Sequence, residues 1–187
     1  MSQQLSRQQI AWRVAQDIPE GAYVYLDSGM PLMVADHVPD GREVIFHSDS
    51  FAMVRGGHID FSVLGACQVA GNGDLANRDL PQGRKAPAVG GAMDLAVGAK
   101  NVFVMMEYFS RDGSCKIVPT CTLPLTGQRC VTTIYTDIAV LDLIDGKVVL
   151  RELIDGITLY TLQAETPVEL QVSPQLRLLT VPAPGAG

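Results

Sequence analysis

Short apolar segments that alternate with glycine corners constrain the fold of this chain most strongly. The stretch from Ser50 to Val104 holds three such corners, Gly56-Gly57, Gly71-Asn72-Gly73 and Gly90-Gly91, each at the edge of an apolar run. Glycine lets the backbone turn tightly and approach a ligand with no side chain in the way. Three of these corners close together in the sequence predict a site built largely from main-chain groups.

Segments with strand and helix patterns alternate along the whole chain. Ser6 and Gln9 form a capping-box pattern at the start of an amphipathic helix. Apolar runs predict strands at residues 22–26, 43–47, 59–64, 102–106, 138–143, 147–153 and 168–172. Such alternation predicts an α/β fold with a mainly parallel open sheet, helices flanking it and a mixed edge. We expect one domain over residues 1–173 and a loose, proline-containing tail over residues 174–187.

Composition excludes several classes of function. The formal net charge is −6 and the chain has no basic run, so we expect no nucleic-acid partner. No apolar run approaches the length of a membrane span, and the polar first residues lack a signal-peptide core. These features predict a cytoplasmic protein with no membrane contact. The four cysteines form no Cys-x-x-Cys pair, so we expect free thiols and no metal site.

Four segments carry a resemblance to a known family. They read SFAMVRGGHID, VLGACQV, GDLAN and AVGGAMDLAVGAKNVFV. They resemble the B subunit of family I 3-oxoacid CoA-transferases, and within the family the 3-oxoadipate enzymes most closely. The resemblance covers about Leu5 to Val172. It implies a CoA-transferase-like fold, a coenzyme A thioester as substrate and no tightly bound cofactor.

The resemblance also implies a reaction and a partner. Succinyl-CoA would be the donor and 3-oxoadipate or acetoacetate the acceptor, and the B subunit would act with an A subunit, often as a heterotetramer. A glutamate carboxylate would attack the thioester and carry CoA as a glutamyl-CoA thioester, which is covalent catalysis with ping-pong order.

The sequence departs from the family at the nucleophile. The family's B subunits place the catalytic glutamate in a Ser-Glu-Asn-Gly motif, a few dozen residues before the Asp-Ser-Phe-Ala-Met segment. Here Ser48 runs directly into Asp49, so no catalytic glutamate can be assigned. Two explanations stay open. Either the natural protein has a further segment between these residues, or the deletion is real and the chain is an inactive CoA- or partner-binding remnant.

Other parts of the predicted site can be assigned to residues. The resemblance implies that Gly90, Gly91 and Ala92, at the start of a helix, offer N–H groups to an oxyanion or to CoA. The alternative is a glycine corner that only packs the helix on the sheet. Asn72 and Asn77, in the loop after the third predicted strand, are candidates for CoA or acyl contacts, or they only bond their own turn.

Three charged residues complete the candidates. Glu107 follows a predicted strand and is a second carboxylate at a strand end, with a supporting polar contact as its expected role. Asp49 is a further carboxylate, for which a helix N-cap is the simpler interpretation. Arg55 beside Gly56-Gly57 could bind a substrate carboxylate or only the end of a helix. A phosphosugar isomerase on a similar sheet is a third functional hypothesis, and it explains none of the four matched segments.

Overall fold

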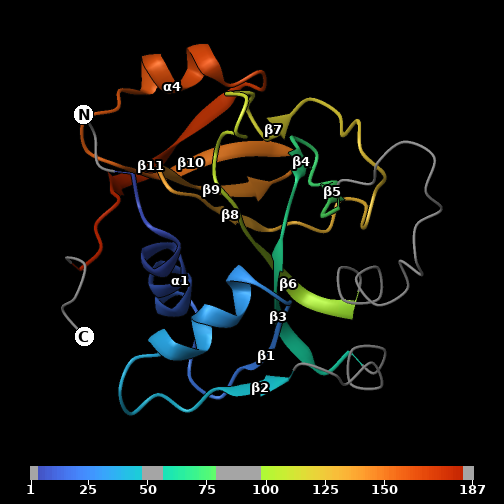
Figure 1. Ribbon diagram of the computed structural model, residues 1–187, viewed down its shortest axis with the longest axis vertical. Coiled ribbons are helices and arrows are strands. Elements are labelled where there is room, and N and C mark those ends of the chain that lie inside the picture. The colour runs from blue at the N-terminus through green and yellow to red at the C-terminus, as the bar shows by residue number, and fades with distance from the viewer. Residues whose placement is uncertain (1–3, 48–56, 79–97, 183–187) are drawn as a thin grey trace.

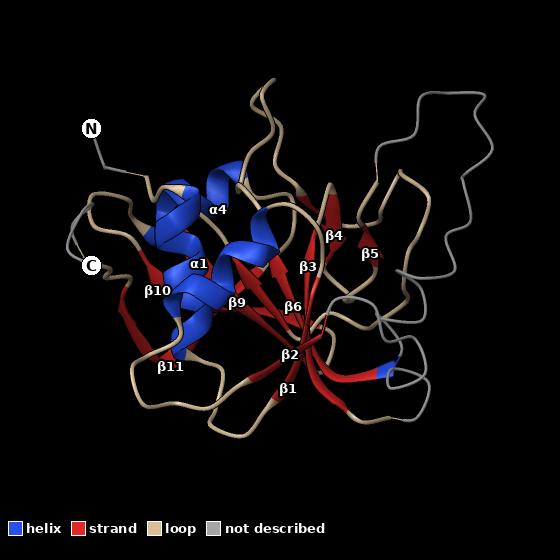
Figure 2. Ribbon diagram, turned by 60° about the horizontal axis from the view of Figure 1, so that its bottom comes forward, coloured by secondary structure: helices blue, strands red, loops and turns tan. Residues whose placement is uncertain are grey.

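An eight-stranded sheet forms the centre of the computed structural model, which describes residues 4–47, 57–78 and 98–182. The strand order is β11-β10-β9-β8-β6-β3-β1-β2 (Figures 1 and 2). The strands are β1 (Tyr23–Leu26), β2 (Ile45–His47), β3 (Ile59–Gly65), β6 (Ala99–Met105), β8 (Thr133–Tyr135), β9 (Ala139–Ile144), β10 (Lys147–Leu153) and β11 (Leu170–Leu178).

The five neighbouring strands β2, β1, β3, β6 and β8 run parallel to one another. β9 is antiparallel to both β8 and β10, while β10 and β11 are parallel. The predicted α/β class, with a mainly parallel sheet and a mixed edge, is therefore confirmed. The apolar run at the end of β6 explains its central place, since Val102, Phe103, Val104 and Met105 are all buried.

A smaller sheet, in the order β5-β4-β7, lies beside the large one. It consists of β4 (Gln68–Ala70), β5 (Leu75–Ala76) and β7 (Ile117–Val118). β4 follows closely after β3, and β7 follows the loop that leaves β6. The small sheet thereby holds the two segments that emerge from the carboxyl ends of these central strands.

Helix α1 (Arg7–Gln16) covers one face of the large sheet together with the 3-10 helix η1 (Met30–His37) (Figures 1 and 2). The predicted capping box is present, because the Ser6 hydroxyl accepts from the Gln9 N–H and the Gln9 side chain accepts from the Ser6 N–H. Ile10, Val14 and Ile18 are buried, as their spacing predicts. The short helix α4 (Leu159–Glu165) precedes β11. No helix among the described residues is long and apolar enough to cross a membrane.

The boundary predicted at residue 173 falls inside β11, so residues 174–178 belong to the sheet and not to a loose tail. Pro174 is tolerated because β11 is an edge strand and the pairing with β10 shifts register between Leu150 and Glu152. Beyond the strand, Leu179 is 3% exposed and its N–H donates to the Leu153 carbonyl at 2.9 Å. Burial of this leucine fixes the chain past the proline.

Candidate functional site at the carboxyl ends of the central strands

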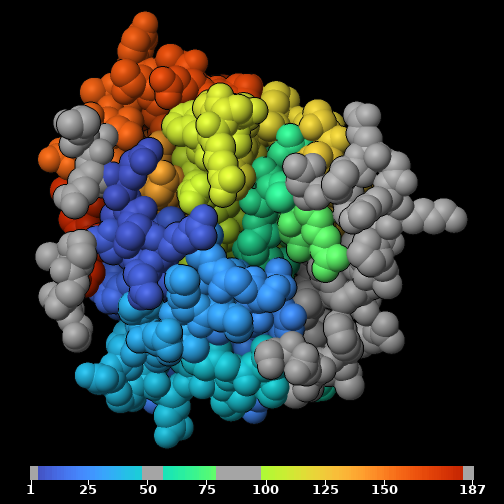
Figure 3. Space-filling view, viewed as in Figure 1, coloured from blue at the N-terminus to red at the C-terminus, as the bar shows by residue number. Residues whose placement is uncertain are grey.

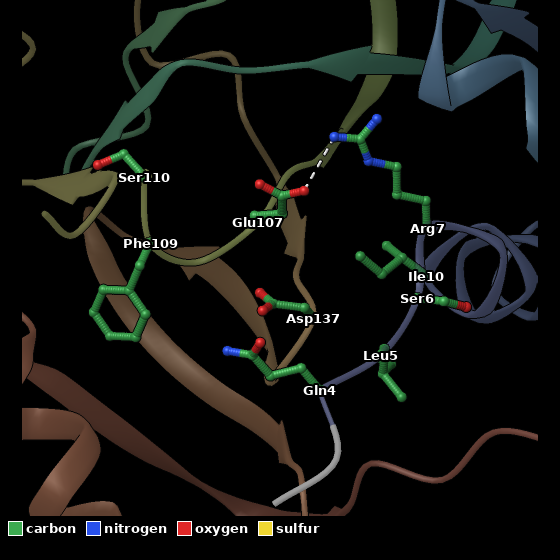
Figure 4. A pocket seen from close by; sticks show the side chains of 9 residues that line it. All are labelled: Gln4, Leu5, Ser6, Arg7, Ile10, Glu107, Phe109, Ser110 and Asp137. Atoms are coloured by element: carbon green, nitrogen blue, oxygen red, sulfur yellow. Dashed lines mark hydrogen bonds and ion pairs between the residues drawn. The ribbon is translucent and has the colours of Figure 1, made fainter. Parts of the chain in front are cut away.

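A cavity of about 330 Å³ lies where β6 and β8 end and α1 begins (Figure 4). Ligands of parallel α/β sheets bind at the carboxyl ends of the strands, so this is the edge where a site is expected. Its polar lining consists of Gln4, Ser6, Arg7, Glu107, Ser110 and Asp137. In the space-filling view, the first turn of α1 lies close to the segment that follows β6 (Figure 3).

Glu107, one of the predicted residues, lies in this cavity two residues beyond the end of β6. Its Oε1 accepts from Arg7 Nη2 at 3.2 Å, and Figure 4 shows the two side chains reaching toward each other. The side chains of Arg7 and Glu107 are 62% and 46% exposed, so the pair stabilises the fold by no more than about 1 kcal/mol. The pair holds Glu107 in place and leaves it accessible, and its role as a supporting polar contact stays a prediction.

Asp137 is the buried carboxylate of the cavity and follows β8 as Glu107 follows β6. It is 7% exposed, and its Oδ1 accepts from the Tyr108 N–H at 2.7 Å. Burial raises the pKa of Asp137, and the nearby Glu107 raises it further. The hydrogen bond from Tyr108 and the charge of Lys116 lower this pKa by less, so it stays above its ordinary value. The Asp137 carbonyl also accepts from the Leu5 N–H at 2.8 Å and so joins the segment before α1 to this edge.

Lys116 is a partly buried cation at the same edge, one residue before β7. Burial lowers the pKa of its amine, and the nearby groups of Cys67, Glu107 and Asp137 act in the opposite direction. The sequence patterns did not single out Arg7, Lys116 or Asp137. A signal for Asp137 was present, because it lies two residues after the strand Thr133–Tyr135, and residues that follow parallel strands lie at the edge where such sheets bind ligands.

Asn72 lies in a different place from Glu107. It lines a second cavity, of about 480 Å³, with Arg129 and the β9–β10 turn at Asp145. That turn lies at the end of the sheet opposite the carboxyl ends of β6 and β8, since β9 runs antiparallel to β8. Asn72 also donates to Asp74 Oδ2 at 3.0 Å and accepts from the Asp74 N–H at 3.0 Å. These contacts match the interpretation in which the asparagine bonds its own turn.

Asn77 is tied to a neighbouring loop. The Oδ1 of Asn77 accepts from the Thr126 hydroxyl at 2.7 Å, and the backbone N–H of Asn77 donates to the Thr126 hydroxyl oxygen at 3.2 Å. Neither Asn72 nor Asn77 is among the residues that line the cavity at Glu107, and contacts from either residue to CoA stay predictions.

The remaining predicted site residues fall in other parts of the sequence. Gly90, Gly91, Ala92, Asp49 and Arg55 lie outside the described residues, so their roles also stay predictions. The four cysteines are partly buried and free. Across the described part of the chain, no three His, Cys, Asp or Glu side chains gather as a metal ion would require.

The sequence of this chain is similar to those of several known proteins. Residues 43–164 match the model of the coenzyme A transferase family. The chain is 41% identical to the B subunit of the 3-oxoadipate CoA-transferase from Acinetobacter baylyi, over 89% of this chain and 95% of that protein. It is 44% identical to the protein of the same name from Pseudomonas putida, over 76% and 85% of the two chains.

A solved structure shows the same fold. An acyl-CoA transferase of Escherichia coli O157:H7 superposes with a TM-score of 0.78 at 17% identity, covering 94% of this chain and 43% of that one.

The alignments also measure what this chain lacks. The alignment with the A. baylyi protein spans 206 positions, whereas 89% of 187 residues is about 166, so about forty positions have no counterpart here. This matches the size of the segment that the sequence resemblance finds missing after Ser48. The chain belongs to the coenzyme A transferase family, and within it to the B subunits of the 3-oxoacid CoA-transferases.

Proposed function

We propose that this chain is the B subunit of an enzyme that moves CoA from succinyl-CoA to a 3-oxo acid, 3-oxoadipate or acetoacetate. The observation that carries the proposal is the identity of 41% to 44% with the B subunits of 3-oxoadipate CoA-transferases over most of both chains. CoA thioesters are substrates in this proposal, and no cofactor is held between turnovers. We expect the enzyme to act in the cytoplasm.

An A subunit completes the enzyme in this proposal. The relatives are named as B subunits, and the E. coli transferase chain of the same fold is more than twice as long as the part that this chain covers. A heterotetramer of A and B subunits is the expected assembly.

The proposed chemistry proceeds through a glutamyl-CoA thioester. A glutamate carboxylate attacks the thioester carbonyl, CoA thiolate leaves and then attacks the resulting mixed anhydride, and the acceptor acid reverses the steps. The glutamate belongs to a segment between Ser48 and Asp49 that the relatives carry. The N–H groups of Gly90 and Gly91 would bind the oxyanion, and the Arg7–Glu107 pair would support the acyl group at the strand ends.

Mixing the chain with an A subunit tests the proposal. The purified chain, the A subunit of the A. baylyi enzyme and the mixture are each incubated with succinyl-CoA and 3-oxoadipate. Separation of the CoA thioesters by chromatography should show 3-oxoadipyl-CoA only in the mixture. Full turnover by this chain alone would contradict the need for a partner.

A second candidate function is a protein that binds CoA or an A-type partner without transferring CoA. The direct Ser48–Asp49 junction and the roughly forty missing positions favour it, because the family's nucleophile falls in the missing segment. The intact mass of the protein from its natural source separates the two. A mass of 20.1 kDa supports the second candidate, whereas a mass several kilodaltons higher, with peptides between Ser48 and Asp49, supports the first.

A further inference from the structure

The charges around the cavity of about 330 Å³ restrict the kind of group that it can bind (Figure 4). Its charged lining consists of Arg7, Glu107 and Asp137. Glu107 balances the charge of Arg7 through their ion pair, and the buried Asp137 already accepts from the Tyr108 N–H at 2.7 Å. A further anion placed here would meet two carboxyl groups and one cation. The cavity therefore favours an uncharged ligand group over a carboxylate or a phosphate.

Arg7 keeps unused hydrogen-bond donors for such a group. A guanidinium carries five N–H donors. Within the described part of the chain, the Arg7 side chain donates only from Nη2, to Glu107 Oε1 at 3.2 Å. The side chain is 62% exposed, so a ligand that enters the cavity can reach the other donors. The side-chain amide of Gln4 also lines the cavity and has no hydrogen-bond partner among the described residues. The cavity thus offers donors to an uncharged acceptor such as a carbonyl oxygen.

The size of the cavity indicates which part of an acyl-CoA it can hold. Small-molecule sites span roughly 300–1,000 Å³. This cavity lies at the small end of that range, so it suits a short acyl group better than a whole CoA. It also lies at the carboxyl ends of the strands, where ligands of parallel sheets bind. The 3-oxo acyl groups of the proposed substrates carry a ketone two carbons from the thioester carbon, and this ketone is an uncharged acceptor.

We propose that Arg7 determines the specificity for 3-oxo acyl groups by donating a hydrogen bond to their ketone oxygen. The inference rests on the proposed function, because that function brings the acyl group to this cavity. Glu107 holds the guanidinium from one side, and the ketone accepts from a donor that Glu107 leaves free. An acyl group of the same length without the ketone leaves this donor without a ligand partner, so it binds more weakly.

Two CoA thioesters that differ only in the ketone test the inference. 3-Oxoadipyl-CoA and adipyl-CoA have the same chain length and the same distal carboxylate. Each is titrated into the 187-residue chain mixed with the A subunit of the A. baylyi enzyme, and calorimetry gives the Kd. No acceptor acid is present and the chain carries no assignable nucleophile, so binding is measured without turnover. We expect 3-oxoadipyl-CoA to bind about tenfold more tightly than adipyl-CoA.

An Arg7→Ala variant assigns the preference to Arg7. In this variant the ratio of the two Kd values should fall to less than about twofold, while the Kd of adipyl-CoA stays unchanged. Loss of a merely structural contact would not change the ratio, since both thioesters would be affected alike. Arg111→Ala removes another exposed arginine and should keep the tenfold preference of about the original size.

Three results would overturn the inference. The first is equal binding of the two thioesters by the unmodified chain, and the second is binding of neither. The third is an equal loss of both in Arg7→Ala, which would mean that Arg7 binds the shared carboxylate or only supports the fold. Transfer activity without a ketone preference would refute the inference alone, whereas a ketone preference without transfer would refute the proposed function alone.

Discussion

Arg13 on α1 and Glu152 on β10 form a buried ion pair that joins the first helix to the antiparallel part of the sheet. Arg13 Nε donates to Glu152 Oε2 at 2.8 Å, and the side chains are 7% and 2% exposed. Arg13 also bonds Asp17, four residues on, with its Nη1 at 2.9 Å from Asp17 Oδ1, and Glu152 accepts from Arg177 of β11 at 2.7 Å. The network thus connects segments from both ends of the chain.

Removing Glu152 should destabilise the fold strongly, because Arg13 would keep a buried charge without its main partner. We expect Glu152→Ala to lower the free energy of unfolding by about 3–5 kcal/mol. Urea unfolding measures this value. Glu169→Ala is the matched control, since Glu169 is exposed, and it should change stability by less than about 0.5 kcal/mol. Equal effects of the two substitutions would contradict the role of the pair.

The same network predicts a loss of stability in acid. Burial raises the pKa of Glu152, but the bonds from Arg13 and Arg177 outweigh it and leave the pKa lowered. Burial likewise raises the pKa of Asp17, and the bonds from Arg13 and Tyr135 outweigh it in the same way. Carboxylates with lowered pKa bind fewer protons in the folded than in the unfolded state. Their stabilisation is therefore present above about pH 4 and is lost as the pH falls through the folded values.

Unfolding measured from pH 7 to pH 3 checks the sign of this effect. The free energy of unfolding should decrease as the pH falls below about 4.5, and Asp17→Asn should flatten that decrease. A steeper acid dependence in Asp17→Asn would show that the lowered pKa of Asp17 does not contribute.

Leu179 should behave as a core residue although it lies beyond Pro174. Leu179→Ala removes a side chain that is 3% exposed, so we expect a loss of about 2–5 kcal/mol. The neighbouring Leu178 is 54% exposed, and Leu178→Ala should cost much less. Chemical denaturation of the two variants compares them directly, and similar small losses would restore the prediction of a loose tail.

Arg7 should matter more for CoA transfer than for stability. Because its pair with Glu107 is exposed, Arg7→Ala should change the free energy of unfolding by less than about 1 kcal/mol. The same variant, assayed with the A subunit, should lose kcat/KM several-fold, since Glu107 would no longer be held at the strand ends. Arg111→Ala is the control, because Arg111 is exposed. Unchanged kinetics in Arg7→Ala would exclude a role of this cavity in the reaction.

Local patterns predicted the fold well. The capping box of Ser6 and Gln9 spans four residues, and the apolar runs of β3 and β6 mark buried parallel strands without reference to the rest of the chain. The continuation of β11 past Pro174 was missed because it depends on the shifted register with β10 and on burial of Leu179. Both are tertiary effects that a local proline signal cannot reveal.

The candidate site was predicted less completely for the same reason. Glu107 was found because it directly follows an apolar strand, but its partner Arg7 lies one hundred residues earlier in the sequence. The pKa of Lys116 depends on burial, which lowers it, and on Glu107 and Asp137 from two other segments, which raise it. Asn72 had two interpretations, a CoA contact or a bond within its own turn; it bonds Asp74 and lies beside the β9–β10 turn, which the antiparallel β9 places at the end of the sheet opposite the carboxyl ends of β6 and β8. The order of segments in the sequence did not reveal that β9 runs antiparallel to β8.

The CoA-transfer assay with an added A subunit tests the central claim most directly. The chain from its natural source, mixed with the A subunit, should convert succinyl-CoA and 3-oxoadipate into 3-oxoadipyl-CoA. A chimera of the 187 residues, with the A. baylyi segment inserted between Ser48 and Asp49, is the positive control. Transfer by both mixtures is the predicted result. Transfer by the chimera alone would contradict the enzyme assignment and identify the chain as a binding protein without its nucleophile.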